Sequence, residues 1–250
     1  MSGIFGNLFG SRKNDLLDFS VLRTDMHAHL LPGIDDGAGN IDESKQLIAG
    51  LQELGFSRFI TTPHCMPGVF DNTIARIQEK LTELKSGYTD TTQPDVQAAA
   101  EYYIDTEFPD RIRNGEKLLT FGEHYVLVEV NMTQPELKLQ ESLFELRLAG
   151  YKPVLAHAER YPYMFKKNAL KEYEQLRDAD ILLQANLRSF TGDYGEVQKR
   201  IVKALAEAGL ISFLGTDIHR TAQLPMLAQA MMDKHVQQLL AGRQLLNNTL

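Results

Sequence analysis

Residues 22–31 read LRTDMHAHLL, an apolar segment in which His27 and His29 stand two positions apart. In an extended chain, residues at positions i and i+2 project from the same side of the backbone, so both imidazoles can reach one metal ion. A pair of surface histidines is the alternative, but a neutral imidazole in an apolar segment needs a polar partner. The segment therefore predicts a β-strand that ends in a metal site.

Apolar runs and helical patterns alternate along the rest of the chain, which is typical of βα units around a parallel sheet. The expected strands are Leu22–His27, Phe59–Thr62, Val96–Tyr103, Tyr125–Val130, Pro153–Ala156, Ile181–Ala185 and Ile211–Leu214. The expected helices are Glu43–Leu54, Asn72–Lys85, Pro135–Ala149, Ala169–Asp178, Glu196–Ala208 and Leu224–Ala241. We predict one α/β domain over residues 21–250, preceded by an N-terminal extension over residues 1–20. Seven units can close into a distorted, TIM-like (β/α)7 barrel or form an open doubly wound sheet, and periodicity does not separate the two.

Composition excludes several classes of function. The 250 residues include 26 Lys and Arg against 33 Asp and Glu, a net charge of −7, which disfavours binding to a nucleic-acid backbone. The single cysteine, Cys65, excludes an internal disulfide and a cysteine-rich zinc site, and it suits a reducing, cytoplasmic compartment. No apolar run approaches the roughly 20 residues of a transmembrane helix, and no glycine-rich nucleotide-binding motif follows the first strand.

Five of the seven histidines lie at or just beyond the C-terminal end of an expected strand. In parallel βα architectures the side chains at these ends converge on the ligand. Two strands also carry a lone glutamate, which is unfavourable in an apolar strand unless the carboxylate is paired or bound to metal. In the loop LPGIDDG, residues 31–37, Asp36 is the expected ligand and Asp35 a supporting residue. The candidate metal ligands are His27, His29, Asp36, His64, Glu101, Glu129, His157, Asp217 and His219.

These nine nitrogen and oxygen donors are too many for one ion, so two or three divalent metals are expected. Mixed imidazole and carboxylate ligation without sulfur suits Mn, Fe or Zn. Arg160, three residues after His157, is either part of a surface ion pair or a guanidinium that binds a phosphoryl oxygen. The pair His64-Cys65 could begin the H-C-x5-R loop of cysteine-dependent phosphatases, but Asp71 stands where that loop needs arginine, which excludes a thiolate nucleophile.

The order of these motifs resembles the polymerase and histidinol phosphatase (PHP) superfamily. The sequence shows D-x-H-x-H, L-P-G-I-D-D-G, T-P-H, two strand-end glutamates, H-x-E-R-Y and D-x-H between Asp25 and His219. More narrowly, it is similar to the CpsB/CapC-type metal-dependent protein-tyrosine phosphatases of bacterial capsule and exopolysaccharide operons. The resemblance implies a distorted seven-stranded (β/α) barrel and hydrolysis of phosphotyrosine by a metal-bound hydroxide, with manganese the most common metal.

The resemblance also implies a division of the ligands among three metals. One metal would bind His27, His29, Glu101 and Asp217, a second Glu101, Glu129 and His157, and a third Asp36, His64 and His219, with Glu101 as the bridge. Arg160 would contact the phosphate. The family often has a further arginine several residues beyond the last ligand, where this chain has Leu224, so the adjacent Arg220 is the candidate for that role.

The implied substrate is a phosphotyrosine-bearing protein, such as a bacterial tyrosine kinase of capsule synthesis. The protein would be cytoplasmic and would reach the inner face of the membrane through this partner. The sequence leaves open whether the chain forms a homo-oligomer. Three alternatives keep the same ligands: a small-molecule phosphatase acting on histidinol phosphate, a phosphoesterase acting on nucleic acid, and a non-catalytic regulatory partner of the kinase with structural metals. The acidic composition weighs against the nucleic-acid alternative.

Overall fold

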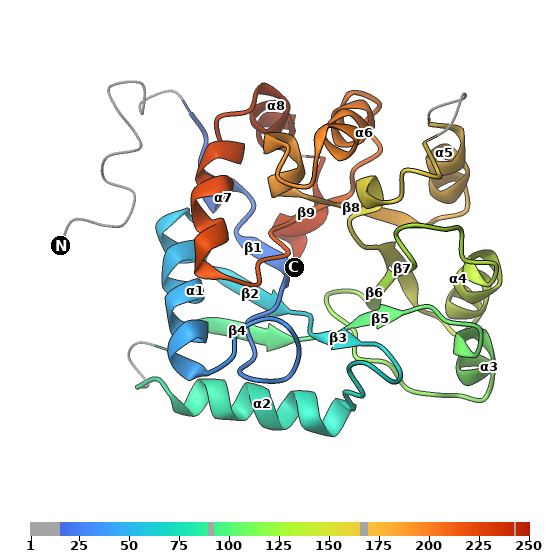
Figure 1. Cartoon of the computed structure of the whole chain (residues 1–250), viewed down its shortest axis with the longest axis horizontal. Helices are drawn as coiled ribbons and strands as arrows, with labels where there is room; N and C mark the ends of the chain where they lie inside the picture. The colour runs from blue at the N-terminus through green and yellow to red at the C-terminus, as the bar shows by residue number, and fades with distance from the viewer. Residues whose placement is uncertain (1–15, 90–92, 166–169, 243) are drawn as a thin grey trace.

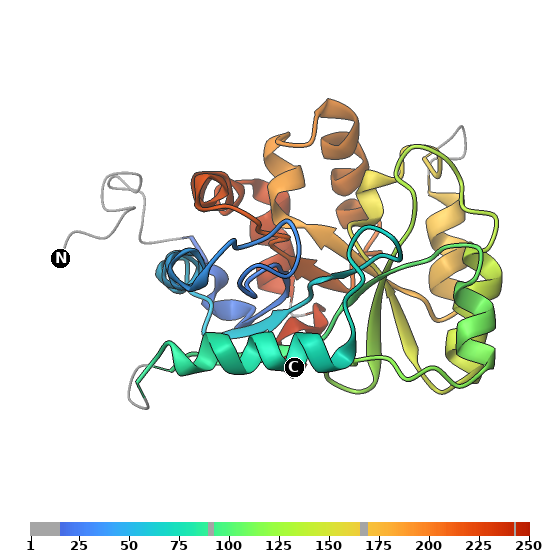
Figure 2. The same ribbon diagram turned by 60° about the horizontal axis from the view of Figure 1, so that its bottom comes forward.

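Parallel strands form the centre of the molecule and helices lie around them (Figure 1; Figure 2). The computed structural model describes residues 16–89, 93–165, 170–242 and 244–250. Within these residues one sheet has the order β1-β2-β4 and a second has the order β3-β5-β6-β7-β8-β9. The strands are β1 (Thr24–Ala28), β2 (Arg58–Thr61), β3 (His64–Cys65), β4 (Asp95–Ala98), β5 (Glu101–Tyr103), β6 (Tyr125–Glu129), β7 (Lys152–Leu155), β8 (Leu182–Asn186) and β9 (Phe213–Gly215).

The two sheets form one curled parallel surface, because in two places the chain leaves a strand of the first sheet and continues as a strand of the second. Strand β3 follows β2 after a short break, and β5 follows β4 in the same way. Backbone hydrogen bonds from Ala99 N to Thr61 O, 2.9 Å, and from Glu101 N to Pro63 O, 3.0 Å, continue the ladder across the break. The mixed α/β fold with a parallel sheet is therefore as predicted. The expectation of one continuous strand over Val96–Tyr103 is wrong, because the structure divides this segment into β4 and β5.

The helices cover the outer face of this curled sheet. In Figure 1, α2 runs along the lower edge, α3 to α5 lie on the right, α6 and α8 at the top, and α1 and α7 on the left. Their bounds are α1 (Ile41–Glu53), α2 (Ile74–Ser86), α3 (Phe108–Arg113), α4 (Leu139–Leu148), α5 (Lys171–Asp178), α6 (Glu196–Glu207), α7 (Leu224–Ala230) and α8 (Lys234–Gly242).

The expected helix Leu224–Ala241 is wrong in one respect, because the structure divides it into α7 and α8. The Asp233 carboxylate accepts a hydrogen bond from the backbone N–H of His235, 2.8 Å, and so satisfies a free donor at the start of a new helix. The short helix α3 was not expected, and the expected start of α5 at Ala169 lies outside the described residues.

Two apolar cores lie on the two faces of the sheet. On β6, Val126 and Val128 belong to the core between strands and helices, whereas Tyr125 and Leu127 belong to a smaller cluster. Because alternate residues of a strand point to opposite faces, the smaller cluster fills the inside of the curl. Its buried members are Met26, Ile60, Ala99, Phe121, Tyr125, Leu127, Val154, Ala156, Phe213 and Leu250.

The first described residues pack against this domain. Phe19 is fully buried and its ring stacks on Phe56, with the ring centroids 5.1 Å apart. Residues 1–15 lie outside the described residues, so the division between residues 1–20 and 21–250 stays a prediction.

The C-terminal segment joins the first strand to the last. Figure 1 places the C-terminus beside β1 and β9. The fully buried amide of Asn247 donates to Thr24 O, 3.0 Å, and to Leu214 O, 2.7 Å, and accepts from Leu214 N, 3.0 Å. At the other end of the two strands, Asp217 N donates to His27 O, 2.7 Å. One side chain therefore takes the place of ladder hydrogen bonds between β1 and β9.

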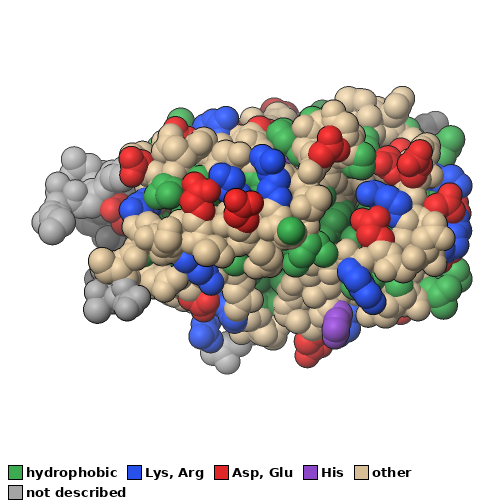
Figure 3. All heavy atoms as spheres, turned by 90° about the horizontal axis from the view of Figure 1, so that it is seen from below, with side chains coloured by type: hydrophobic (Ala, Val, Ile, Leu, Met, Phe, Trp, Pro, Cys, Tyr) green, Lys and Arg blue, Asp and Glu red, His purple; other side chains and the backbone are tan. Residues whose placement is uncertain are grey.

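The face of the molecule drawn in Figure 3 carries acidic and basic side chains next to one another. Among the described residues on this face, no continuous cationic surface appears that could follow a nucleic-acid backbone. No helix among the described residues is long and apolar enough to span a bilayer.

We expect Asn247→Ala to lower the free energy of unfolding by about 2–4 kcal/mol, because it leaves buried backbone groups of β1 and β9 without partners. Urea denaturation followed by circular dichroism measures the change. The control is Asn248→Ala, which alters the neighbouring exposed asparagine and should leave the midpoint unchanged. Equal stability of the two variants would show that the Asn247 amide does not hold the strands together.

Candidate metal centre

The predicted ligand side chains gather at the C-terminal ends of the strands, on the inside of the curl. On β6 the inward positions run from Tyr125 and Leu127 to Glu129, so the same face changes from apolar to acidic. Glu101 begins β5 and is fully buried, and His64 begins β3 beside it in register. Three overlapping groups have donor atoms within 4.8 Å of one another: His29, Asp36, His64 and His219; His27, His29 and Asp217; and His64, Glu101 and Glu129.

Two of the predicted ligands adopt backbone conformations that are uncommon outside glycine. The φ angles of His157 and Asp217 are 32° and 49°, in the left-handed region. Such angles are concentrated at functional sites, where surrounding contacts hold the chain in place. Here they turn each side chain inward directly after β7 or β9, and both residues are almost completely buried.

Hydrogen bonds set the tautomers of His27 and His29. Nδ1 of His27 faces Oε1 of Gln184 at 3.0 Å, and Nδ1 of His29 faces Oδ2 of Asp35 at 2.8 Å. Because both oxygens only accept, each Nδ1 carries the hydrogen and each Nε2 presents a lone pair. The two Nε2 atoms lie 3.4 Å apart, with Asp217 Oδ1 3.5 and 3.4 Å away. Lone pairs and a carboxylate that converge on one point repel one another unless a proton or a cation lies between them.

The neighbouring carboxylates also raise the pKa values of the His27 and His64 imidazoles. Burial disfavours protonated His27, but attraction to Glu101 and Asp217 outweighs it and raises its pKa. Burial likewise opposes protonation of His64, whereas Glu101 and Glu129 raise the pKa of His64 to about 9. The side chains are therefore arranged to hold positive charge at this position.

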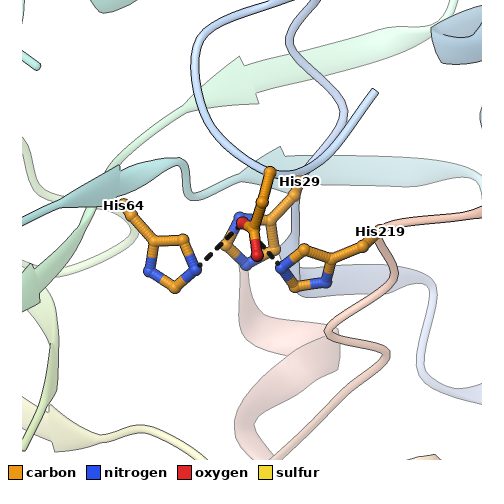
Figure 4. Close-up of side chains that lie close together, drawn as sticks. His29, His64 and His219 are labelled. Carbon is orange, nitrogen blue, oxygen red and sulfur yellow. Dashed lines mark ion pairs between the residues drawn. The ribbon is translucent and has the colours of Figure 1, made fainter. Parts of the chain in front are cut away.

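The group of His29, Asp36, His64 and His219 is the most exposed of the three, and Figure 4 shows its side chains. His64 and His219 turn ring nitrogens toward the space in front of His29. Asp36 Oδ1 lies 3.4 Å from His64 Nε2 and 3.3 Å from His219 Nε2. The hydrogen bond with His219 is the main cause of the lowered pKa of Asp36, about 2, so this carboxyl is ionised at neutral pH.

Glu101 links the groups through its two oxygens. Oε1 lies 2.9 Å from His157 Nε2, whereas Oε2 lies 3.1 Å from His64 Nδ1 and 3.3 Å from His27 Nε2. This Oε2 atom is buried and has no hydrogen-bond partner among the described residues. A buried carboxylate oxygen without a donor is unfavourable, and a divalent cation between it and the imidazoles removes that penalty. The residues present thus fit a metal centre of nitrogen and oxygen ligands.

The contacts follow most of the ligand division that the resemblance implies. His27, His29 and Asp217 lie together, and so do Asp36, His64 and His219, with His29 added to the second set. His157 is close to Glu101 but its Nε2 is 3.7 Å from Glu129 Oε2. His64 is nearer to that acid, with Nδ1 3.0 Å from Glu129 Oε1.

Supporting residues on β8 were missed at the sequence level. Gln184 Oε1 accepts from His157 N, 2.7 Å, as well as facing His27, and Asn186 Nδ2 donates to Asp217 Oδ2, 2.7 Å. The lone-carboxylate argument that pointed to Glu129 applies equally to these buried amides at alternate positions of an apolar strand. Asp35 acts as the expected support, since it also accepts from Gly37 N, 2.8 Å, and His64 N, 3.1 Å.

A cavity of about 370 Å³ opens onto the centre and carries three arginines, Arg160, Arg188 and Arg220. Arg160 Nη1 lies 3.4 Å from Asp217 Oδ2. Arg220 Nη1 instead donates to the carbonyl oxygens of Asp36, Gly37 and His219, and so ties the Asp36 loop to the segment after β9. A phosphate contact by Arg220 stays a prediction.

Cys65 lies outside the centre. Its thiol donates to Asn72 O at 3.5 Å, and burial raises its pKa to about 12, so the thiolate is not available at neutral pH. The other two histidines are also elsewhere: His124 is exposed, and His235 is paired with Asp233 and Glu207.

Comparisons with known proteins point to one group. Residues 23–249 match the family model described as capsular polysaccharide synthesis, CpsB/CapC. The tyrosine-protein phosphatase YwqE of Bacillus subtilis is 29% identical over 196 residues, covering 78% of this chain and 76% of YwqE. The putative tyrosine-protein phosphatase CapC of Staphylococcus aureus is 26% identical over 212 residues, covering 84% and 82%.

Solved structures give the same result. The fold is similar to that in the crystal structures of YwqE from Bacillus subtilis and CpsB from Streptococcus pneumoniae, described as unique metal-dependent tyrosine phosphatases, with a TM-score of 0.72, 28% identity and 84% of each chain covered. A histidinol phosphate phosphatase from Lactococcus lactis, complexed with zinc, L-histidinol and phosphate, shares the fold at a TM-score of 0.52 and 16% identity, covering 85% of this chain and 94% of that one.

We expect Asp35→Asn to weaken binding of Mn²⁺ by about 10- to 100-fold, because it removes the charge that orients His29 and keeps the proton on Nδ1. Calorimetric titration of metal-stripped protein measures the dissociation constants. Asp42→Asn, in the exposed first turn of α1, makes the same change away from the centre and should bind as the parent protein does. Identical affinities for both variants would contradict the assigned role of Asp35.

Proposed function

The chain belongs to the CpsB/CapC family of capsular polysaccharide synthesis proteins, and on this premise we propose that it is a metal-dependent protein-tyrosine phosphatase. The observation that carries the proposal is Glu101, a fully buried carboxylate that faces imidazoles of three other strand ends. Two of those imidazoles, His64 and His157, line the cavity that opens to solvent. Relatives similar over most of the chain are named tyrosine-protein phosphatases. A metal centre with an open side is the arrangement of a catalytic rather than a structural site.

The finer assignments are part of the same proposal. The ligands are the nine predicted residues, shared between two or three ions with Glu101 as the bridge, and manganese is the proposed metal, with iron and zinc as alternatives. The strands close as a distorted (β/α)7 barrel, a view supported by the parallel bridge between Ala28, the last residue of β1, and Ile218, which follows β9. The seam is tight enough to bring His27 and Asp217 together.

Bound divalent ions supply Lewis-acid activation of water and neutralise charge on a phosphoryl group. The chain's own residues do the rest. Arg160, at the edge of the cavity, donates to the phosphoryl oxygens and stabilises the negative charge that develops there. Asp35 and Gln184 keep His29 and His27 in one tautomer, and Asn186 holds the Asp217 oxygen that faces away from His27. The arginines explain how a chain with a net charge of −7 binds an anionic substrate.

The proposed substrate is a phosphotyrosine side chain of a protein, with a bacterial tyrosine kinase of capsule or exopolysaccharide synthesis as the partner. A cytoplasmic location, close to the membrane through that partner, is the matching proposal. Phenolate is a good enough leaving group, with a pKa of about 10, that no general acid is assigned.

The decisive experiment combines metal analysis with two substrates. We expect Mn-loaded protein to hydrolyse a phosphotyrosine peptide, to act much less well on histidinol phosphate, and to lose activity when EDTA removes the metal. Preference for histidinol phosphate would support the small-molecule alternative, and no hydrolysis of either would support the regulatory one.

We expect Glu101→Gln to reduce hydrolysis of the peptide by about 100-fold or more and to lower the metal content, because the bridging charge is lost while the shape is kept. Glu123→Gln, at an exposed glutamate paired with Lys152, is the matched control and should keep full activity. An active Glu101→Gln protein without bound metal would refute the proposal.

We expect Cys65→Ala to keep phosphotyrosine hydrolysis within about twofold, since a buried thiol with a raised pKa is not a nucleophile. Steady-state kinetics with the same peptide measure the effect. Loss of turnover with an unchanged circular dichroism spectrum and metal content would contradict this prediction and support Cys65 as a nucleophile.

A further inference from the structure

We infer that Tyr194 is a positioning residue, whose ring supports the Arg160 guanidinium so that its N–H groups stay free for a phosphoryl group. The inference rests on the proposed function and deepens it, because it concerns how the phosphate-binding arginine is aimed. Neither residue spacing nor the comparisons assign Tyr194 a role. Four observations about its surroundings carry the argument.

Arg160 lies over the face of the Tyr194 ring. Its Cζ atom is 4.6 Å from the ring centroid, well within the range of a cation–π contact. All N–H donors of a guanidinium point outward in its plane, so a contact through the flat face uses none of them. A hydrogen-bonded partner in the same place would occupy donors that the substrate needs.

The Arg160 guanidinium has one further contact among the described residues, and a phosphoryl group would replace it. Its Nη1 is 3.4 Å from Asp217 Oδ2, a long hydrogen bond to a carboxylate that also faces the imidazoles. Without a second support, a long and flexible side chain that leaves Asp217 would lose its orientation, at a cost in side-chain entropy. The ring provides that support from within the same cavity, since Arg160 and Tyr194 both line it.

The Tyr194 ring is itself held in place. Its hydroxyl donates to Asp217 Oδ2, 3.2 Å, and accepts from Asn186 Nδ2, 3.3 Å, and from Arg188 Nη2. The Arg188 Cζ atom lies 4.7 Å from the ring centroid, so two arginines flank one ring. A ring fixed at both its hydroxyl and its face is a rigid support.

Arg188 is suited to this anchoring role. Only 4% of the residue is exposed, in η3 (Leu187–Thr191), and its donors reach Asp193 Oδ2 at 2.5 Å and Asp217 O at 3.1 Å. Gly192, with φ 90°, ends η3 and allows the turn that brings Asp193 and Tyr194 back over Arg188. The segment after β8 thus builds the support from one continuous stretch of chain.

The test compares two substitutions of Tyr194 by the binding of inorganic phosphate to Mn-loaded protein, measured by calorimetry. Tyr194→Leu removes the ring face, and we expect phosphate to bind about 10-fold more weakly, which corresponds to about 1.4 kcal/mol. Tyr194→Phe keeps the ring but removes the hydroxyl, and we expect a loss of less than about threefold. Tyr88→Leu makes the same change at a half-buried ring beside Lys45, away from the cavity, and should have no effect.

A double-mutant cycle separates support of Arg160 from general packing. In an Arg160→Ala background, Tyr194→Leu should change phosphate affinity by less than about twofold, because the residue that it supports is absent. With the peptide, Tyr194→Leu should raise KM and lower kcat in the parent protein and do neither in the Arg160→Ala background. Metal content is measured for every variant and should equal that of the parent.

Additive effects of the two substitutions would overturn the inference. So would equal losses for Tyr194→Phe and Tyr194→Leu, or a lower metal content in both, since either result would assign Tyr194 to Asp217 instead of Arg160. Failure of the proposed function is a different result: the parent protein would not hydrolyse the peptide at all, whereas the phosphate-binding cycle can still be measured.

Discussion

The arrangement of side chains at the C-terminal ends of the strands depends on one buried negative charge, the carboxylate of Glu101. It lies on the inner face of the sheet with no exposure to solvent, within 3.3 Å of imidazole nitrogens from His27, His64 and His157. An isolated carboxylate in such a position is strongly unfavourable, so it needs imidazoles or a cation close to it. The strands bring those partners because each ends at the same edge of the curl.

A change of polarity along each strand makes this arrangement compatible with folding. The inward-facing residues away from the metal centre are apolar, and they form a packed cluster with the C-terminal residues Leu246 and Leu250. The inward positions near the C-terminal ends of the strands are Glu, Gln and Asn, each matched to a histidine or an acid at the end of another strand. Apolar packing therefore provides stability at one end, and the other end can hold a costly polar site without exposing the core to water.

Some of the centre could be predicted from the sequence because its chemistry is visible in single segments. Two histidines at alternate positions around the end of β1 can share a face, and a glutamate between valines in β6 needs a partner. Tyr194 and Arg188 carry no such signal, since an aromatic and a basic residue near a glycine are typical of any exposed loop. Their role follows only because Tyr194 lies against Arg160, more than twenty residues away along the chain and at a different strand end, and Arg188 lies against Tyr194.

By itself, the sequence determined the alternation of strands and helices, the shared face of the two histidines near the end of the first strand, and a set of candidate metal ligands. These properties are local, because they follow from periodicity and from the chemistry of short segments. Only the tertiary structure decided how the strands break and meet: the division of Val96–Tyr103, the amide of Asn247 between β1 and β9, and the orientation of each imidazole. Those depend on hydrogen bonds between residues far apart in the chain, which no local pattern encodes.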